Sequence, residues 1–296
     1  MFELQNEIRI VVHQTAPLLG ELEVNEGEVK ETVAKHPGTH LQVFPELALT
    51  GYSLRKKVQG MAYSLHDGAP VVFPRSASPV AYGFPERGRD ELVYNTAILQ
   101  HGTRILGTHR KVYLPTYGIF DEGRYFARGR QAPPVVTLPS GWRVGLLVCE
   151  DFWHPGLLYL AAMQGADIVL VLSAAPGRGE TGMERTEKGQ GTGFASQDTW
   201  ILLARTAAIQ YGVFLVLANR CGVEEGVSFA GGSMVAGPDG ALLARAPQGQ
   251  PATLEASLSR KSLRQARTPF AHLRDEDPDF LRRTLGEILA REEAVP

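Results

Sequence analysis

The sequence is poor in the residues that build disulfides and metal sites. Its 296 residues include only two cysteines, Cys149 and Cys221, and contain no Cys-x-x-Cys or His-Glu-x-x-His spacing. In a reducing compartment two cysteines are more often free thiols than a disulfide. Without the usual ligand spacings a metal centre has no basis either. We therefore expect two free thiols and no metal.

Long apolar runs and a dominant charge are absent as well. Apolar stretches such as residues 168–172 and 213–218 are far shorter than the roughly 20 residues that span a bilayer. The net charge is −2, so no basic excess indicates nucleic-acid binding. Glu3 and Glu7 lie near the N-terminus, where a secretory signal would have an apolar segment. These features predict a cytoplasmic protein that binds neither membrane nor nucleic acid.

Short β-branched runs alternate with segments of helical periodicity along most of the chain. Some neighbouring runs are joined by Gly-containing turns typical of hairpins. The expected strands are residues 8–13, 40–45, 95–100, 103–109, 135–138, 142–149, 168–172, 213–218, 233–236 and 242–245, and the expected helices are residues 21–35, 157–164 and 199–211. Because βα alternation is mixed with hairpins, the pattern predicts a layered α/β fold with mixed sheets.

Two segments depart from this alternation. Residues 177–196 are rich in Gly, Thr and charged side chains, and a polar stretch of this length is typical of a functional loop or lid. Residues 273–293 have the pattern of a helix that packs on the body or on a partner. We therefore divide the chain into a main domain of residues 1–270 and a C-terminal helical tail of residues 271–296.

Three residues with reactive side chains lie at the ends of three of the expected strands and indicate one chemistry. Glu46 lies in Phe-Pro-Glu-Leu, in an expected polar loop, while Lys111 lies in His-Arg-Lys-Val-Tyr-Leu-Pro and Cys149 in Leu-Leu-Val-Cys-Glu-Asp. Strand ends of α/β folds converge on one rim, where such folds build their sites. There a carboxylate could serve as the base of a thiol, and an ammonium could offset charge on a carbonyl oxygen. Taken singly, a cysteine at the end of an apolar strand is usually a small buried hydrophobe, and a lone Glu or Lys is usually solvated at the surface.

Together, in this order, the three motifs resemble the signature of the nitrilase, or carbon–nitrogen hydrolase, superfamily. The resemblance includes Phe-Asp-Glu at residues 120–122 and Phe-Ala-Gly-Gly-Ser at residues 229–233, and it extends from about residue 8 to about residue 245. It implies an α/β fold, namely a four-layer α-β-β-α sandwich with two mixed β-sheets. It also implies that residues 1–270 form a carbon–nitrogen hydrolase domain that needs no cofactor.

The resemblance further implies roles for individual residues. Cys149 would be the nucleophile, Glu46 the general base and Lys111 the oxyanion stabiliser. Glu122 would be an auxiliary carboxylate beside the lysine, and the backbone N–H of Glu150 would be the second oxyanion donor. The implied reaction is hydrolysis of an amide through a thioester intermediate, with release of ammonia.

The sequence around the second and third motifs is most similar to the glutaminase domain of glutamine-dependent NAD synthetases. By that resemblance Tyr117, Phe120 and Ser173 would help to hold glutamine, and Glu150 would face its α-amino group. A buried carboxylate and hydroxyl suit a zwitterion, because each charged end needs a partner once it is desolvated. We therefore expect glutamine or a similar small amide as substrate.

The chain departs from those synthetases in its missing ligase motif. They continue into an ATP-dependent domain with a Gly-rich SGGxDS loop, which this sequence does not contain. We therefore expect a free-standing glutaminase that hands ammonia to a separate ammonia-dependent NAD synthetase, or a stand-alone amidase. The loop of residues 177–193 also differs, so no arginine in it is assigned a role.

Three alternatives stay open at this point. The chain could hydrolyse N-carbamoyl amino acids, as β-ureidopropionases do, or it could be an ω-amidase. It could also be a catalytically idle binding subunit. The resemblance implies a homo-oligomer, a dimer or larger, for which residues 273–293 are the candidate contact.

Overall fold

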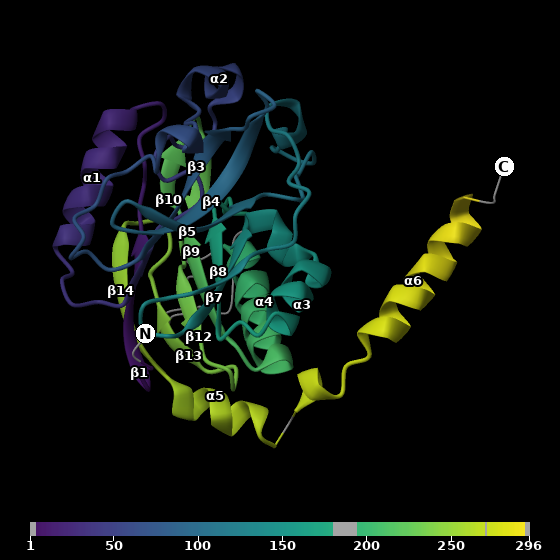
Figure 1. Cartoon of the computed structure of the whole chain (residues 1–296). Helices are drawn as coiled ribbons and strands as arrows, with labels where there is room; N and C mark the ends of the chain where they lie inside the picture. The colour runs from purple at the N-terminus through teal and green to yellow at the C-terminus, as the bar shows by residue number, and fades with distance from the viewer. Residues whose placement is uncertain (1–3, 180–193, 270, 294–296) are drawn as a thin grey trace.

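The computed structural model describes residues 4–179, 194–269 and 271–293. Two six-stranded sheets lie face to face, and helices cover their outer faces (Figure 1). This arrangement confirms the four-layer α-β-β-α sandwich with two mixed sheets. None of the helices in the described ranges is long and apolar enough to cross a membrane.

Both sheets combine parallel and antiparallel strands. In order of hydrogen bonding, the first sheet consists of β14 (Ala252–Ser259), β1 (Glu7–Gln14), β2 (Leu41–Val43), β3 (Val80–Arg87), β4 (Val93–His101) and β5 (Arg104–Arg110). The second consists of β13 (Leu242–Arg245), β12 (Met234–Ala236), β9 (Phe214–Asn219), β8 (Ile168–Ser173), β7 (Arg143–Val148) and β6 (Val135–Thr137). β1, β2 and β3 are parallel, as are β7, β8 and β9, and the other neighbours are antiparallel.

Six helices and a separate hairpin complete the described fold. The helices are α1 (Leu22–Ala34), α2 (Val58–Met61), α3 (Pro155–Met163), α4 (Ala195–Tyr211), α5 (Arg260–Arg267) and α6 (Pro278–Glu293). The hairpin consists of β10 (Cys221–Glu224) and β11 (Val227–Ala230). Short 3-10 turns lie at η1 (Arg55–Lys57), η2 (Leu65–Asp67), η3 (Glu122–Arg124), η4 (Cys149–Trp153) and η5 (His272–Arg274).

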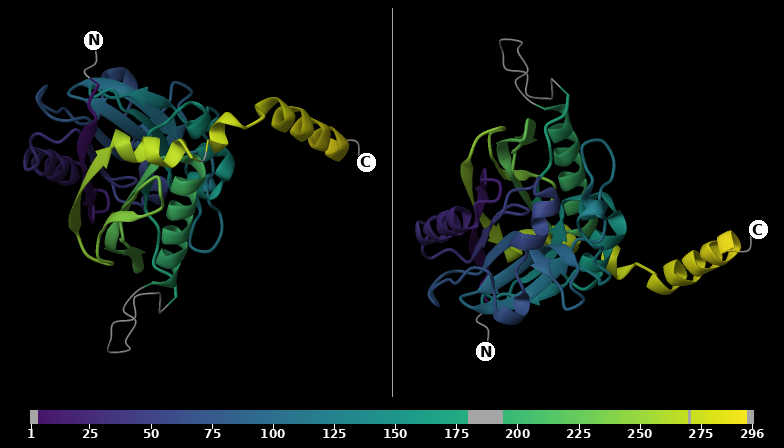
Figure 2. Two further views of the ribbon diagram at one scale, coloured as in Figure 1. Left: turned by 90° about the horizontal axis from the view of Figure 1, so that it is seen from below. Right: turned by 90° about the horizontal axis from the view of Figure 1, so that it is seen from above.

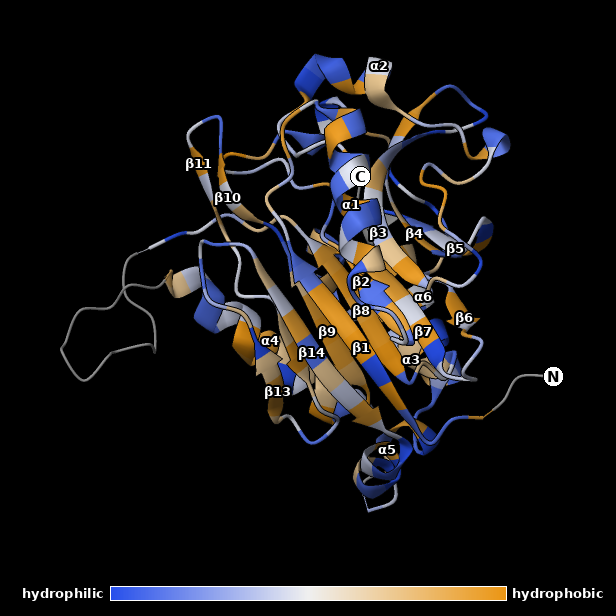
Figure 3. Cartoon of the chain, turned by 90° about the vertical axis from the view of Figure 1, so that its left-hand side faces the viewer, coloured by the Kyte–Doolittle hydropathy of each residue, from blue (hydrophilic) through white to orange (hydrophobic). Residues whose placement is uncertain are grey.

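Alternating side chains give the first sheet two apolar faces. On β4, Ala97 and Leu99 belong to the core cluster between the sheets, whereas Ile98 belongs to a second cluster that includes Val29 of α1. The strands β8 and β9 are buried along their whole length, because the first sheet covers one face and α3 and α4 cover the other. Figure 3 shows hydrophobic residues concentrated in these central strands.

Most strands of both sheets lie where the sequence predicts them, but several elements were missed. β3, β14, the β10–β11 hairpin and α5 were not predicted, and α4 begins at Ala195 rather than at residue 199. Gly83 and Pro85 interrupt the β-branched pattern of β3. Pro85 is tolerated because β3 extends beyond the short β2, so its nitrogen faces no strand partner on that side.

Two of the expected loops are the residues that follow residue 45 and residues 177–196. The segment after residue 45 was expected to be a polar loop, but Glu46 to Thr50 are all buried. That expectation is wrong, because Gly83 of β3 lies against Glu46 and Leu47, and Ala48 and Leu49 belong to the apolar cluster that includes Val29 of α1. The predicted polar loop of residues 177–196 lies mostly outside the described residues, which resume at Phe194.

The tail forms a helix that stands apart from the sandwich. α6 extends away from the body in Figure 1 and in both views of Figure 2, so it does not pack there as one expectation held. Its large apolar side chains are each about half exposed; they are Phe280, Leu281, Leu285, Ile288 and Leu289. Contact with a partner, and the division of the chain at residue 270, stay predictions.

Candidate active site

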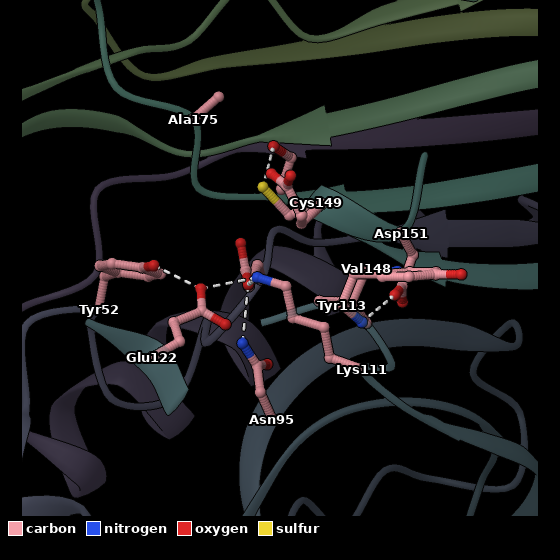
Figure 4. Close-up of polar contacts among 12 residues, drawn as sticks. Tyr52, Asn95, Lys111, Tyr113, Glu122, Val148, Cys149, Asp151 and Ala175 are labelled. Carbon is pink, nitrogen blue, oxygen red and sulfur yellow. Dashed lines mark hydrogen bonds and ion pairs between the residues drawn. The ribbon is translucent and has the colours of Figure 1, made fainter. Parts of the chain in front are cut away.

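Glu46, Lys111 and Cys149 meet at one edge of the sandwich. Glu46 follows β2, Lys111 follows β5 and Cys149 follows β7, so the first two come from one sheet and the third from the other. Lys111 Nζ donates to Glu46 Oε1 at 2.8 Å and to Glu122 Oε1 at 2.7 Å (Figure 4). The structure therefore brings together all three predicted catalytic residues and the predicted auxiliary carboxylate.

The side chain of Lys111 is fully buried and remains charged. Burial alone would lower the pKa of Lys111, but the carboxylates of Glu122 and Glu46 outweigh it and raise that pKa well above its ordinary value. The ammonium is thus a fixed positive charge beside the thiol of Cys149. A preorganised charge of this kind stabilises an oxyanion without reorganising at the moment of reaction.

Glu46 is anchored through one carboxylate oxygen only. Its Oε1 accepts from Lys111 and, at 2.7 Å, from Asn95 Nδ2, whereas its buried Oε2 has no hydrogen-bond partner among the described residues. Gly83 of β3 packs against this segment so closely that a Cβ would lie 2.5 Å from Leu47 N and 2.8 Å from Glu46 Cα. Only glycine allows that approach. The free Oε2 is the candidate proton acceptor.

Glu122 contributes the third charge of the cluster. Its Oε1 accepts from Lys111 and from the Tyr52 hydroxyl, and its Oε2 is buried without a partner in the described ranges. Burial and Glu46 raise the pKa of Glu122 to about 7, against the opposing effect of Lys111. Glu224 in turn accepts a hydrogen bond from the backbone N–H of Tyr52 at 3.0 Å, which fixes the position of Tyr52 beside Glu122. Glu122 therefore changes charge near neutral pH.

Cys149 occupies a constrained turn. Its φ of 43° lies in the left-handed region, which residues other than glycine seldom adopt. Ser173 Oγ donates to its Sγ at 3.3 Å. Burial and Glu46 raise the pKa of Cys149 well above its ordinary value, and Lys111 and Ser173 offset only part of this rise. The resting sulfur is thus a thiol, which needs a base to become nucleophilic.

A cavity of about 310 Å³ opens beside Cys149. It is lined by Tyr117, Phe120, Cys149, Glu150, Trp153, Ala175, Pro176, Arg178, Ser196, Thr199 and Trp200. The Tyr117 hydroxyl donates to Glu150 at 2.8 Å, and the guanidinium carbon of Arg178 lies 5.4 Å from the centre of the Phe120 ring. A ligand in this cavity would meet aromatic walls and side chains of both charges.

The predicted substrate-binding residues divide into two groups. Tyr117, Phe120 and the side chain of Glu150 line the cavity. Ser173 is fully buried and contacts the sulfur instead. The roles assigned to these four residues stay predictions.

Sequence reasoning missed several residues that build the site. Asn95 and Tyr52 fix the two carboxylates, Asp151 lies buried beside the nucleophile turn, and Arg178 lines the cavity. No sequence signal singles out Asn95, because Thr96 and Gln100 of the same strand are polar and buried as well. Arg178 lies in the loop in which no arginine was assigned a role. Among the described residues no group of three or more His, Cys, Asp or Glu could hold a metal ion.

The chain is similar to known proteins over most of its length. The model of a family described as carbon-nitrogen hydrolase matches residues 14–268. A protein of Pseudomonas protegens described as "Hydrolase in pqqF 5'region" is 26% identical over 92% of this chain and 90% of its own length. The glutamine-dependent NAD(+) synthetase of Thermotoga maritima is 30% identical over 80% of this chain, but over only 39% of the synthetase. For the same enzyme of Acinetobacter baylyi the values are 28%, 81% and 42%, so the chain spans about two fifths of these synthetases.

Two solved structures of hydrolases match nearly end to end. The carbon-nitrogen hydrolase of Helicobacter pylori G27 superposes with a TM-score of 0.78 at 26% identity, covering 95% of this chain and 98% of that one. A variant of the amidase of Nesterenkonia sp. AN1, with acrylamide added at its active-site cysteine, gives a TM-score of 0.67 at 26% identity. That match covers 93% of this chain and 99% of the amidase.

Proposed function

The chain belongs to the carbon–nitrogen hydrolase family, and from this premise we propose that it hydrolyses a small amide with Cys149 as nucleophile. Glu46 is the general base and Lys111 the oxyanion stabiliser. The observation that carries the proposal is the buried ammonium of Lys111, held between Glu46 and Glu122 beside a buried thiol. Burying such a cluster is costly, and its position matches where negative charge would develop.

In the first half-reaction the thiol becomes the nucleophile. Glu46 Oε2 accepts the Sγ proton as the sulfur bonds to the carbonyl carbon of the amide. The resulting oxyanion is stabilised by Lys111 and by the backbone N–H of Glu150. Glu46 then gives the proton to the amide nitrogen, the C–N bond breaks, and ammonia leaves a thioester on Cys149.

The second half-reaction returns the enzyme to its resting state. Water attacks the thioester carbon while Glu46 accepts one of its protons. The same ammonium and N–H stabilise the second oxyanion. When the C–S bond breaks, the carboxylic acid leaves and the sulfur recovers a proton from Glu46.

We propose glutamine, or a close analogue, as the amide. The cavity beside Cys149 presents the Glu150 carboxylate and the Arg178 guanidinium, which would pair with an α-ammonium and an α-carboxylate. An N-carbamoyl amino acid would satisfy Arg178 but would leave Glu150 facing no cation. The similarity to glutamine-dependent synthetases supports the same choice.

Steady-state assays of ammonia and glutamate release test both parts of the proposal. Glutamine, N-carbamoyl-β-alanine and propionamide serve as substrates for the wild type. Cys149→Ser should abolish turnover, whereas Cys221→Ser, a change at the other buried thiol, should leave it intact. Turnover by Cys149→Ser near the wild-type rate would refute the nucleophile, and absence of turnover in the wild type would favour an idle binding subunit.

Charge variants test the choice of glutamine. Glu150→Gln and Arg178→Gln should raise KM for glutamine by roughly tenfold or more, because each removes one charge-assisted partner of about 1.5–3 kcal/mol. Neither change should alter KM for propionamide, which has no charged end. Equal effects on both substrates would contradict recognition of a zwitterion, and preferential turnover of N-carbamoyl-β-alanine would favour the alternative hydrolase.

Two kinds of partner complete the proposal. A separate ammonia-dependent NAD synthetase would use the ammonia, as the two parts of the similar synthetases suggest. A second copy of the chain would cover the apolar side of α6, whose five large side chains are about half exposed. A cytoplasmic location fits both partners and stays a prediction.

A further inference from the structure

One buried carboxylate outside the proposed triad ties together the two segments that bear its lysine and its cysteine. Asp151 is completely buried at the nucleophile turn. Its Oδ1 accepts the backbone N–H groups of Val112 and Tyr113, both at 3.0 Å. Its Oδ2 accepts the backbone N–H of Val148 at 3.2 Å and contacts His109 Nε2 at 2.9 Å. Since a carboxylate only accepts, His109 Nε2 is the donor.

These contacts bracket both reacting groups along the chain. His109 lies two residues before Lys111, and Val112 directly follows it, so the lysine is fixed from both sides. Val148 directly precedes Cys149, and Asp151 itself follows two residues later. Because Lys111 ends a strand of the first sheet and Cys149 ends a strand of the second, the carboxylate links the two sheets at the site (Figure 4).

We propose that Asp151 and His109 are positioning residues that set the separation between the Lys111 ammonium and the Cys149 sulfur. This inference rests on the proposed function of those two groups. Neither residue reaches the substrate cavity, so their effect passes through backbone and ring placement. The bond to Val148 also braces the left-handed backbone of Cys149, whose φ of 43° would otherwise relax. Displacement of a reacting group by about 1 Å can cost about 10²-fold in rate.

The competing explanation is that the pair only stabilises the fold. A buried histidine with a buried partner elsewhere provides the matched control. His13 is 1% exposed on β1, and its Nε2 lies 2.8 Å from Gln42 Oε1 in a hydrogen bond that involves no triad residue. Loss of that bond should lower stability in the same way without moving Lys111 or Cys149.

The experiment compares His109→Leu, His109→Gln and His13→Leu in the full chain. Four quantities are measured: the melting temperature, kcat and KM for the best amide, and the rate of Cys149 alkylation by iodoacetamide at fixed pH. His109→Leu removes the donor to Asp151, and it should lower kcat and the alkylation rate by about 10²-fold with KM within about twofold. His109→Gln keeps a side-chain N–H that can reach the carboxylate. Its kcat and alkylation rate should therefore each be at least about tenfold higher than those of His109→Leu.

The control and the opposing results are distinct. His13→Leu should lower the melting temperature at least as much as His109→Leu while kcat and alkylation stay within about twofold of wild type. The inference is overturned if His109→Leu leaves both rates unchanged, or if His13→Leu reduces them equally. It is also overturned if kcat and the alkylation rate of His109→Gln are no higher than those of His109→Leu. Retained turnover in Cys149→Ser would overturn the proposed function together with this inference.

Discussion

Replacing Lys111 with methionine should expose the cost of the buried charge cluster. The substitution keeps an unbranched apolar stem and removes the ammonium that donates to Glu46 at 2.8 Å and to Glu122 at 2.7 Å. Two buried carboxylates then face each other with only Asn95 and Tyr52 as donors. Removal of one member of a buried ion pair costs about 3–5 kcal/mol, because the remaining charge is buried without compensation.

The loss should depend on pH in a defined direction. In wild type the pKa of Glu122 is already raised to about 7, and removal of the ammonium raises it further. A carboxyl whose folded-state pKa exceeds its unfolded value holds a proton that the unfolded chain has released. Folding then becomes less favourable as pH rises through that interval. The free energy of unfolding of Lys111→Met should therefore fall by about 3–5 kcal/mol near pH 8 and by distinctly less near pH 5.

Urea unfolding followed by circular dichroism, at both pH values, checks this prediction. Adding Glu122→Gln to Lys111→Met removes one of the two repelling charges, so the double variant should regain stability near pH 8 and gain little near pH 5. The difference between the single and double variants isolates the coupling between the two sites. A loss below about 1 kcal/mol that is equal at both pH values would refute the reasoning, because it would mean that the carboxylates are not strongly coupled to the lysine.

Three further outcomes are expected. Burial lowers the pKa of His13 to about 4, so as pH falls below 6.5 the histidine takes up a proton in the unfolded chain but not in the folded one. Wild type should therefore lose about 3 kcal/mol more stability between pH 6.5 and 4 than His13→Gln. Urea unfolding at both pH values measures this, and an equal loss in the two proteins would contradict it. A Cβ on Gly83 would collide with the backbone of Glu46, so Gly83→Ala should lower both the melting temperature and kcat, whereas Gly156→Ala, where a Cβ meets nothing within 4 Å, should change neither. Removal of residues 277–296 should convert an oligomer into a monomer, as measured by light scattering, and should leave kcat unchanged. A monomeric wild type would disprove the role given to α6.

The sequence predicted those parts of the fold that local patterns determine. The apolar runs of β8 and β9 and the helical period of α1 are visible without tertiary information. β3 was missed because Gly83 and Pro85 break its pattern, and what makes it a strand is pairing with β4 along its whole length. β14 was missed although Leu254, Ala256 and Leu258 alternate with exposed polar residues, which is the pattern of a strand with one buried face, so the signal was present and was overlooked.

In the site, too, residues that local motifs indicate were predicted, whereas residues placed by tertiary contacts were not. Its proposed triad was found because each member lies at the end of a predicted strand and because the three motifs together resemble the signature of the family. The partners that orient those groups were not found, because the contacts of Asn95 with Glu46 and of Tyr52 with Glu122 join residues far apart in sequence. The burial of Glu46 was also missed, since a proline and a glutamate in one segment read as a solvated loop while the close approach of β3 encloses it.

The electrostatics of the site constrain how the proposed nucleophile is activated. Burial and Glu46 raise the pKa of Cys149, and Lys111 cannot reverse this because its charge is shared by two carboxylates. A stable thiolate before substrate binding is therefore disfavoured. Proton transfer to Glu46 Oε2 must then accompany attack on the carbonyl carbon, when negative charge passes from sulfur to the carbonyl oxygen. During attack the Lys111 ammonium would interact with the oxyanion. The same charge that does not ionise the resting Cys149 would thus stabilise the transition state.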